Sequence, residues 1–274
     1  MGETTAAALE ALAVGLADPD GDVDALHVVE QRLVAARDTA LVPALEAHLA
    51  AAVDAGNWYA RVVLARLLVR TAGRTSLPAL LRAYARDLGD DQDSLTTDLT
   101  VLVREDPASA RALLLAWTGD RDPDLRRTAV WLLGYIPDPA DIAWLARAAT
   151  DADEKVRAAA AGTLAGHSGT DPRAADVLAG LLCDSSPQVR ICVLDSLGYA
   201  RRLQTLPAIR AAADDREARV RAWVAIALDR FPQPEAGPDP GTVTVLERLG
   251  EDPDAYVRET ALAALQRLRA AGTD

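Results

Sequence analysis

An arginine preceded by an apolar residue recurs through the second half of the chain at intervals of 31, 33, 31 and 37 residues. Further apolar residues follow three, four and seven positions after each arginine. Side chains at these offsets lie on one face of an α-helix. A repeat of this length predicts stacked helix pairs, because one pair cannot bury its apolar face without neighbours. The arginines, which we call the anchors, are Arg126, Arg157, Arg190, Arg221 and Arg258.

An aspartate stands six residues before each anchor. A cation in the first turn of a helix opposes the helix dipole, so each anchor needs a carboxylate nearby. The repeated aspartate supplies one, and we expect the two residue types to form a structural ladder. The aspartates are Asp120, Asp151, Asp184, Asp215 and Asp252.

A second apolar stretch precedes each anchor helix, so the predicted unit is a first helix (A), a short turn and a second helix (B). Eight Asp-Pro or Ser-Pro dipeptides mark the helix starts. Their side-chain oxygen can cap a helix, and proline lacks an N–H that the first turn would leave unpaired. The dipeptides are Asp18-Pro19, Asp106-Pro107, Asp122-Pro123, Asp138-Pro139, Asp171-Pro172, Ser186-Pro187, Asp239-Pro240 and Asp252-Pro253.

The repeat is less regular in the first half of the chain. Arg61 matches the anchor position, whereas Thr96 stands where the next anchor should be. A further unit fits near Glu30, in a register that the residues leave open. About eight units therefore fit the chain, and we expect either a hinge or a change in curvature at the unit that contains Thr96.

The best repeats follow the pattern Asp-x-x-x-x-Val-Arg-x-x-Ala-x-x-x-Leu-Gly, as in the unit with Asp151, Val156 and Arg157. In these residues the chain resembles the HEAT-repeat family, in particular the HEAT-like repeats named after bilin lyases. The match to the pattern is specific over residues 119–270, moderate over 54–73 and weak elsewhere before residue 119.

The resemblance implies an all-α, right-handed α-solenoid of about eight two-helix HEAT-like repeats, in one domain over residues 1–274. The repeats in 1–118 are expected to be degenerate and those in 119–270 well matched. The resemblance also implies that the B helices line the concave face and that the ladder joins neighbouring repeats. Residues 231–241, rich in proline, are expected to form an inserted surface loop.

Residues that carry catalysis or hold metals are few and scattered. His27, His48 and His167 lie far apart, and none is followed by the glutamate of the His-Glu pairs that iron-binding HEAT-like hydroxylases use. The two cysteines, Cys183 and Cys192, form no CxxC pair, and a reactive thiol needs a positive neighbourhood. No P-loop, GxSxG or GxGxxG pattern occurs. We therefore expect no enzymatic activity, no cofactor and no metal site.

Aromatic and arginine side chains recur on the B helices away from the apolar stripe. Such residues are the usual anchors of protein interfaces. The alternative interpretation is that Trp131 and Trp223 fill gaps between repeats. The predicted partner-binding residues of the concave face are Trp131, Tyr135, Tyr199, Trp223, Arg66, Arg70, Arg127 and Arg230.

The formal net charge of -12 argues against binding to nucleic acid or to an anionic membrane surface. No apolar run reaches the ~18 residues of a membrane span, and the N-terminus lacks the basic start of a secretory signal. We expect a cytoplasmic protein that is a monomer or a weak dimer.

These observations predict a non-catalytic scaffold or adaptor that binds a protein or peptide, because solenoids offer long concave surfaces. One alternative is an accessory factor or lyase-type chaperone for a partner enzyme or cofactor. Another is a HEAT-like DNA glycosylase, which would need a basic concave surface that this acidic chain does not display in its sequence.

Overall fold

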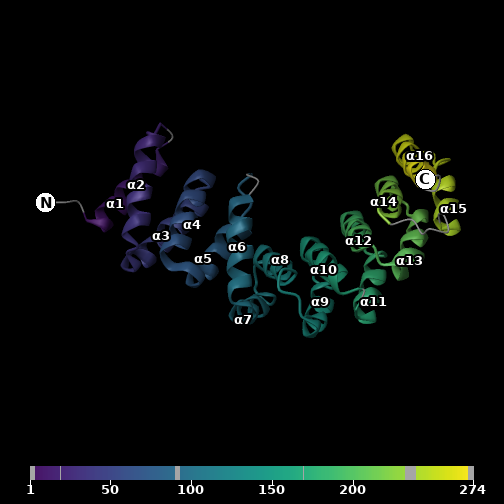
Figure 1. Cartoon of the computed structure of the whole chain (residues 1–274), viewed down its shortest axis with the longest axis horizontal. Helices are drawn as coiled ribbons and strands as arrows, with labels where there is room; N and C mark the ends of the chain where they lie inside the picture. Colours follow the sequence, from purple (N-terminus) through teal and green to yellow (C-terminus); the bar gives the residue numbers. More distant parts are fainter. Residues whose placement is uncertain (1–3, 19, 90–92, 169, 232–238, 271–274) are drawn as a thin grey trace. The chain divides into compact units, whose positions relative to one another are not determined.

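The computed structural model describes residues 4–18, 20–89, 93–168, 170–231 and 239–270 (Figure 1). These residues form sixteen α-helices and five short 3-10 helices, with no strand among them. The prediction of an all-α chain is confirmed. Residues 232–238 of the expected loop lie outside the described residues, whereas Phe231 at its start is buried.

The helices form eight consecutive pairs, as the repeat predicts. The A helices are α1 (Thr5–Ala17), α3 (Val42–Asp54), α5 (Leu77–Ala85), α7 (Pro107–Trp117), α9 (Ile142–Ala148), α11 (Pro172–Leu181), α13 (Leu206–Ala211) and α15 (Pro240–Leu249). The B helices are α2 (Val23–Ala36), α4 (Trp58–Ala72), α6 (Asp93–Glu105), α8 (Pro123–Leu133), α10 (Glu154–His167), α12 (Pro187–Ala200), α14 (Ala218–Asp229) and α16 (Ala255–Ala270). The 3-10 helices are η1 (Thr39–Leu41), η2 (Gly73–Ser76), η3 (Pro139–Asp141), η4 (Leu203–Thr205) and η5 (Ala212–Asp214).

The chain divides into two compact units, Met1–Ile136 and Pro137–Asp274. In the second unit the B helices α10, α12, α14 and α16 pack side by side in chain order. The apolar residue before each anchor is buried there, at Val156, Val189, Val220 and Val257. The predicted apolar stripe is therefore the core of this unit.

The helix starts follow the predicted capping chemistry in most places. Five aspartates of the Asp-Pro dipeptides accept a backbone N–H in the first turn: Asp106, Asp122, Asp138, Asp171 and Asp239. The other three predicted caps differ. Ser186 stands at the start of α12, but its side chain makes no capping hydrogen bond and donates to Glu154 instead. Asp18 ends α1, and Asp22 caps α2 in its place. Asp252 lies too early to cap α16, which begins at Ala255; Asp254 accepts the N–H of Tyr256 instead, and Asp252 accepts the N–H of Asp254.

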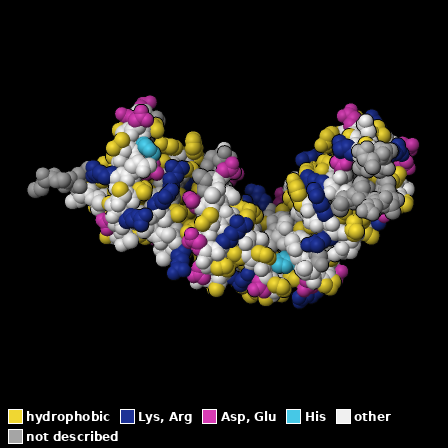
Figure 2. All heavy atoms as spheres, in the orientation of Figure 1, with side chains coloured by type: hydrophobic (Ala, Val, Ile, Leu, Met, Phe, Trp, Pro, Cys, Tyr) yellow, Lys and Arg dark blue, Asp and Glu magenta, His cyan; other side chains and the backbone are white. Residues whose placement is uncertain are grey.

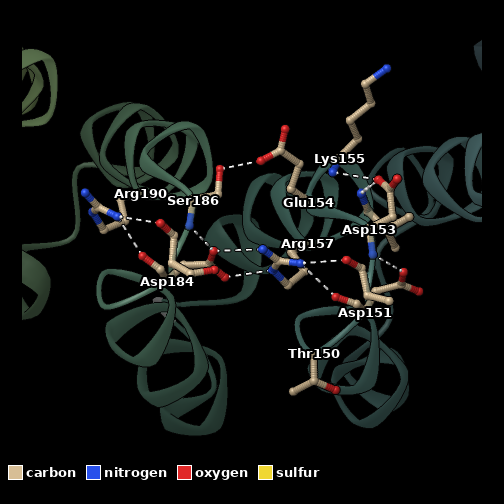
Figure 3. Close-up of polar contacts among 12 residues, drawn as sticks. Thr150, Asp151, Asp153, Glu154, Lys155, Arg157, Asp184, Ser186 and Arg190 are labelled. Carbon is tan, nitrogen blue, oxygen red and sulfur yellow. Dashed lines mark hydrogen bonds and ion pairs between the residues drawn. The ribbon is translucent and has the colours of Figure 1, made fainter. Parts of the chain in front are cut away.

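Each anchor of the second unit that has a following repeat binds the aspartate of that repeat, and Figure 3 shows this pair for Arg157 and Asp184. Arg157 donates from Nε and Nη2 to the two carboxylate oxygens of Asp184, at 2.7 and 2.9 Å. Arg190 binds Asp215 in the same way at 2.6 and 2.8 Å. Arg221 binds Asp252 at 2.7 and 2.8 Å.

The remaining guanidinium nitrogen, Nη1, binds the turn of the anchor's own repeat. In Arg190 it donates to the carbonyl of Asp184 at 2.7 Å, and in Arg258 to the carbonyl of Asp252 at 2.7 Å. The Oδ1 atom of Asp184 also accepts the N–H of Ser186, at 2.8 Å. One arginine therefore holds two successive A–B turns, so the ladder connects the repeats through both charge and backbone hydrogen bonds.

The ladder is altered in the first unit. Arg61, which is fully buried, donates to the backbone carbonyls of Ala83 and Arg86 at the end of α5, at 3.3 and 2.8 Å. The following unit carries Thr96 in place of an arginine that would reach towards Asp120. Here α8 packs against α5 and α7, whereas α6 packs against α4, α5 and α7. The loss of the anchor thus coincides with a change in the packing partner of the next B helix.

We predict that Arg190→Ala lowers the free energy of unfolding by about 3 kcal/mol, because it leaves the half-buried carboxylate of Asp215 without its bidentate partner. Urea unfolding followed by circular dichroism measures this. Arg173→Ala is the matched control, since Arg173 is exposed and pairs with Asp171 two residues before it, and it should change the midpoint little. An Arg190→Ala midpoint equal to that of the native chain would contradict a stabilising ladder.

We also predict that the contribution of the ladder disappears in acid. The hydrogen bonds from Arg157 hold the pKa of Asp184 below its ordinary value, and Arg221 does the same for Asp252. A carboxyl whose pKa is lower in the folded than in the unfolded chain stabilises the fold above the unfolded pKa of about 3.9, and this stability is lost as the pH falls through the folded pKa. The stability difference between the native chain and Asp184→Asn should therefore be large near neutral pH and shrink below about pH 4. An equal difference in urea titrations at both pH values would argue against this linkage.

Candidate functional site

The B helices present a second stripe of residues on the side away from the core. Relative to each anchor these residues lie at -2, +2, +5 and +9, which share one side of a helix. We call this stripe, on neighbouring B helices of one unit, the outer B-helix face. In the second unit it includes Cys192, Asp195, Tyr199, Trp223, Ile226 and Arg230.

In the second unit the predicted residues Tyr199, Trp223 and Arg230 form one cluster. The guanidinium carbon of Arg230 lies 4.1 Å from the ring centroid of Tyr199 and 5.6 Å from that of Trp223. Its Nη1 donates to the carboxylate of Asp195 at 2.6 Å. The tyrosine ring is 67% exposed, and Trp223 is half-buried. The cluster thus has an exposed aromatic surface, and its arginine is held by Tyr199, Trp223 and Asp195.

This cluster depends on the close approach of α12 and α14 at Gly198. A Cβ atom at Gly198 would lie 3.1 Å from the Cα of Ala227 and 3.2 Å from the Cδ of Arg230. The glycine of the Leu-Gly pair therefore allows the side chain of Arg230 to cross α12 and reach Tyr199.

The rest of the outer face of the second unit has a different character. Gly162 and Gly166 leave the surface of α10 shallow. Arg267 of α16 pairs with Asp229 of α14 at 2.9 Å. Tyr256, at position -2 of α16, is 58% exposed. Tyr256 was not among the predicted residues, because all of those follow their anchors. Its position, two residues before Arg258, lies two helical turns before +5 and so on the same side of the helix.

In the first unit, Arg66 and Arg70 of α4 face carboxylates from both neighbouring B helices. Arg66 lies 3.7 Å from the carboxylate of Glu30, which is buried on α2 in the place of an anchor. Burial raises the pKa of Asp98 on α6, and the nearby charges of Arg66 and Arg70 offset only part of that rise. Both predicted arginines therefore belong to a row of alternating charges across α2, α4 and α6.

The predicted aromatic residues of the first unit lie where α8 packs on α5. Trp131 stacks on Tyr84 of α5, with centroids 5.1 Å apart and planes at 6°, and Tyr135 meets its edge at 5.2 Å. Arg104 of α6 lies 5.2 Å from the ring centroid of Tyr135. This geometry favours the alternative interpretation of Trp131: its side chain fills the space between two helices instead of facing a partner. Tyr84 was not predicted from the sequence, because it lies on an A helix and the anchor pattern covers only B helices.

Arg127 also acts within the first unit. Its Nη2 donates to the carbonyl of Ala85 at 3.5 Å, and its Nε lies 3.8 Å from the carboxylate of Asp124. The C-terminal carbonyls of α5 thus accept hydrogen bonds from both Arg61 and Arg127, in keeping with the negative end of a helix dipole. Arg127 therefore points towards α5 rather than presenting its charge to a partner.

The charges of both units are interspersed. Figure 2 shows arginine side chains next to carboxylates on the visible face of each unit. On the outer B-helix face the pairs are Arg66 with Glu30, Arg230 with Asp195 and Arg267 with Asp229. Most of the positive charge predicted to meet a partner is therefore neutralised by neighbouring helices.

The histidines and cysteines remain apart in the structure. His27 lies 3.4 Å from Glu30, and His48 lies 3.1 Å from Glu10, while His167 is buried. Burial raises the pKa of the Cys192 thiol, which disfavours the reactive thiolate. Within the described residues no three of the side chains that bind metals come together. None of the described helices is long and apolar enough to cross a membrane.

Comparison with known proteins decides the family. A family profile described as HEAT repeats matches residues 110–190 and 178–266, which together cover more than half of the chain. The chain belongs to the HEAT-repeat family. The match begins at α7, so it covers the well-matched repeats and leaves most of the degenerate HEAT units of the first unit outside it.

Several solved structures are similar to the chain in fold. Escherichia coli YibA is 16% identical with a TM-score of 0.50, covering 94% of this chain and 92% of its own. Human deoxyhypusine hydroxylase is 19% identical with a TM-score of 0.41, covering 97% of both chains. A designed armadillo-repeat protein is 18% identical with a TM-score of 0.39, covering 70% of this chain and 99% of its own. At these identities the likeness concerns the fold alone. No curated protein matches the chain by sequence.

We predict that Gly198→Leu separates α12 from α14 and lowers the free energy of unfolding by about 1–3 kcal/mol, because the added side chain meets the backbone of Ala227. The matched control is Gly166→Leu on α10, where a Cβ meets no atom within 4 Å. That control should be neutral or slightly stabilising, since leucine favours helix more than glycine does. Thermal unfolding of both variants compares them; equal loss of stability in the two would show that the close approach is unimportant.

Proposed function

We propose that this HEAT-repeat chain is a non-catalytic scaffold or adaptor of the cytoplasm that binds a protein or peptide segment on the outer face of its B helices. The observation that carries the proposal is the cluster of Tyr199, Arg230 and Trp223. Tyrosine, tryptophan and arginine are the residue types that contribute most of the binding energy at protein interfaces.

The arrangement of the cluster supports a preorganised surface. Arg230 is held by Asp195 and by two aromatic rings, so little side-chain freedom remains to be lost on binding. The helix that carries Tyr199, α12, packs against α10, whose exposed Gly162 and Gly166 let a partner approach the backbone closely.

The charge pattern supports a protein over a nucleic acid. The net charge is -12, and the arginines of the outer face pair with carboxylates of adjacent helices. Phosphate backbones are held by arginines and lysines that are available to neutralise them. We accordingly expect a partner anchored by apolar or aromatic side chains, because the paired arginines leave little free positive charge for an acidic segment.

The proposal predicts that the double variant Tyr199→Ala/Trp223→Ala weakens partner binding by at least about 30-fold, which corresponds to about 2 kcal/mol for the loss of interface anchors. The tagged chain is purified from the cells that produce it, its partners are identified by mass spectrometry, and the affinity of the main partner is measured by calorimetry.

The matched control is Trp144→Ala on the A helix α9. Trp144 is 40% exposed and has Arg147 over its ring at 5.1 Å, so it resembles the cluster in chemistry but lies on an A helix. The control should keep the partner. Equal binding by the double variant and the native chain would contradict the proposed face.

A further inference from the structure

The first unit contains a groove that the outer B-helix face does not include. It lies between the A helices α3 and α5, is also lined by the start of α8, and has a volume of about 330 Å³. That volume lies at the lower end of the range for ligand sites. We call it the α3–α5 groove.

Leu125 gives this groove an accessible apolar side chain. It stands immediately before the anchor of α8, a position that is buried in the four later repeats, at Val156, Val189, Val220 and Val257. Leu125 is only half-buried and lines the groove. The reason is the altered packing after Thr96, since α8 lies on α5 and its first turn projects into the space beside α3. A core leucine is thus available to an apolar group from outside.

The floor of the groove is apolar and its two walls have opposite charge. Leu49 and Val53 of α3 lie along the floor with Leu125. The wall on α3 carries Glu46 and Asp54. The opposite wall carries Arg82 of α5, whose guanidinium lies 5.0 Å from the ring centroid of Trp117, and Arg86, the residue after the helix. All four charged residues are exposed.

The position of Asp54 is unfavourable for α3 itself. It is the last residue of that helix, where a carboxylate faces the negative end of the helix dipole. Neither Asp54 nor Glu46 takes part in an ion pair among the residues that the structure describes. Both carboxylates are exposed and line the groove, so they are accessible to a basic group of a partner.

The dimensions fit two turns of helix. Glu46 and Asp54 are eight residues apart on α3, which spans roughly 12 Å at the helical rise. An amphipathic helix presents apolar side chains at i, i+3 or i+4 and i+7 over the same length, with charged residues on either flank.

We propose that the α3–α5 groove binds an amphipathic helix of a partner protein, with its apolar stripe on Leu49, Val53 and Leu125. Basic residues on one flank of this helix pair with Glu46 and Asp54. Acidic residues on the other flank lie along the positively charged wall that Arg82 and Arg86 line. The opposite charges of the walls therefore set the direction in which the helix lies.

The test uses a displayed library of amphipathic helices, selected on the full chain and counter-selected on Ala50→Trp. Ala50 is exposed and lines the groove, so a tryptophan there fills the space while leaving the core intact. Enriched sequences should carry an apolar i, i+3/i+4, i+7 stripe with basic residues on one flank and acidic residues on the other. Their affinity for Ala50→Trp, measured by calorimetry, should fall at least tenfold.

Reversing the charge of the α3 wall gives an independent test. Glu46→Arg/Asp54→Arg should weaken the enriched peptides at least tenfold and should recover binding when the basic flank of the peptide is made acidic. The control is Tyr199→Ala/Trp223→Ala, which should bind these peptides normally, so that failure of this site and failure of the B-helix proposal are distinguishable. The proposal would be overturned if no peptide were enriched, or if the enriched peptides bound Ala50→Trp or the charge-reversed variant as tightly as the native chain. Loss of binding in the control would also overturn it.

Discussion

The bidentate pair between an anchor arginine and the aspartate of the following repeat determines how neighbouring helix pairs meet. Arg190 contacts Asp215 through two nitrogens and its own turn through the third, so it is shared by two repeats. A guanidinium suits this role because its donors are rigid and planar, and they match a carboxylate on one edge and carbonyls on the other. The apolar stripe supplies the burial, and the ladder fixes the spacing of the A–B turns along the second unit.

The first unit shows what happens where that interaction is missing. Arg61 takes backbone carbonyls of α5 as acceptors, and Thr96 offers no guanidinium at all. The next B helix then packs on α5, with Trp131 and Tyr84 stacked in the contact and Leu125 left half-buried. The same departure from the repeat therefore creates both an aromatic contact and an open groove.

The outer B-helix face is organised by pairing between adjacent helices. Arg66 meets Glu30, and Arg230 meets Asp195, so charges that a single helix would present to solvent are largely compensated within each unit. What remains accessible is aromatic surface, above all Tyr199. This explains how a chain with many arginines offers a surface better suited to protein side chains than to phosphates.

By itself, the sequence determined the helical repeat, the apolar stripe and the residue types of the ladder, because each follows from spacing along one helix. It could not determine which aspartate an anchor binds, since Arg157 reaches Asp184 across 27 residues and only stacking brings them together. Tertiary structure alone likewise decided that Arg230 joins Tyr199 and Trp223, that Trp131 stacks on a tyrosine from an A helix, and that Leu125 stays half-buried. The physical reason is that a helical period specifies the side of a helix on which a residue lies, whereas its contacts depend on the neighbour that packs against that side.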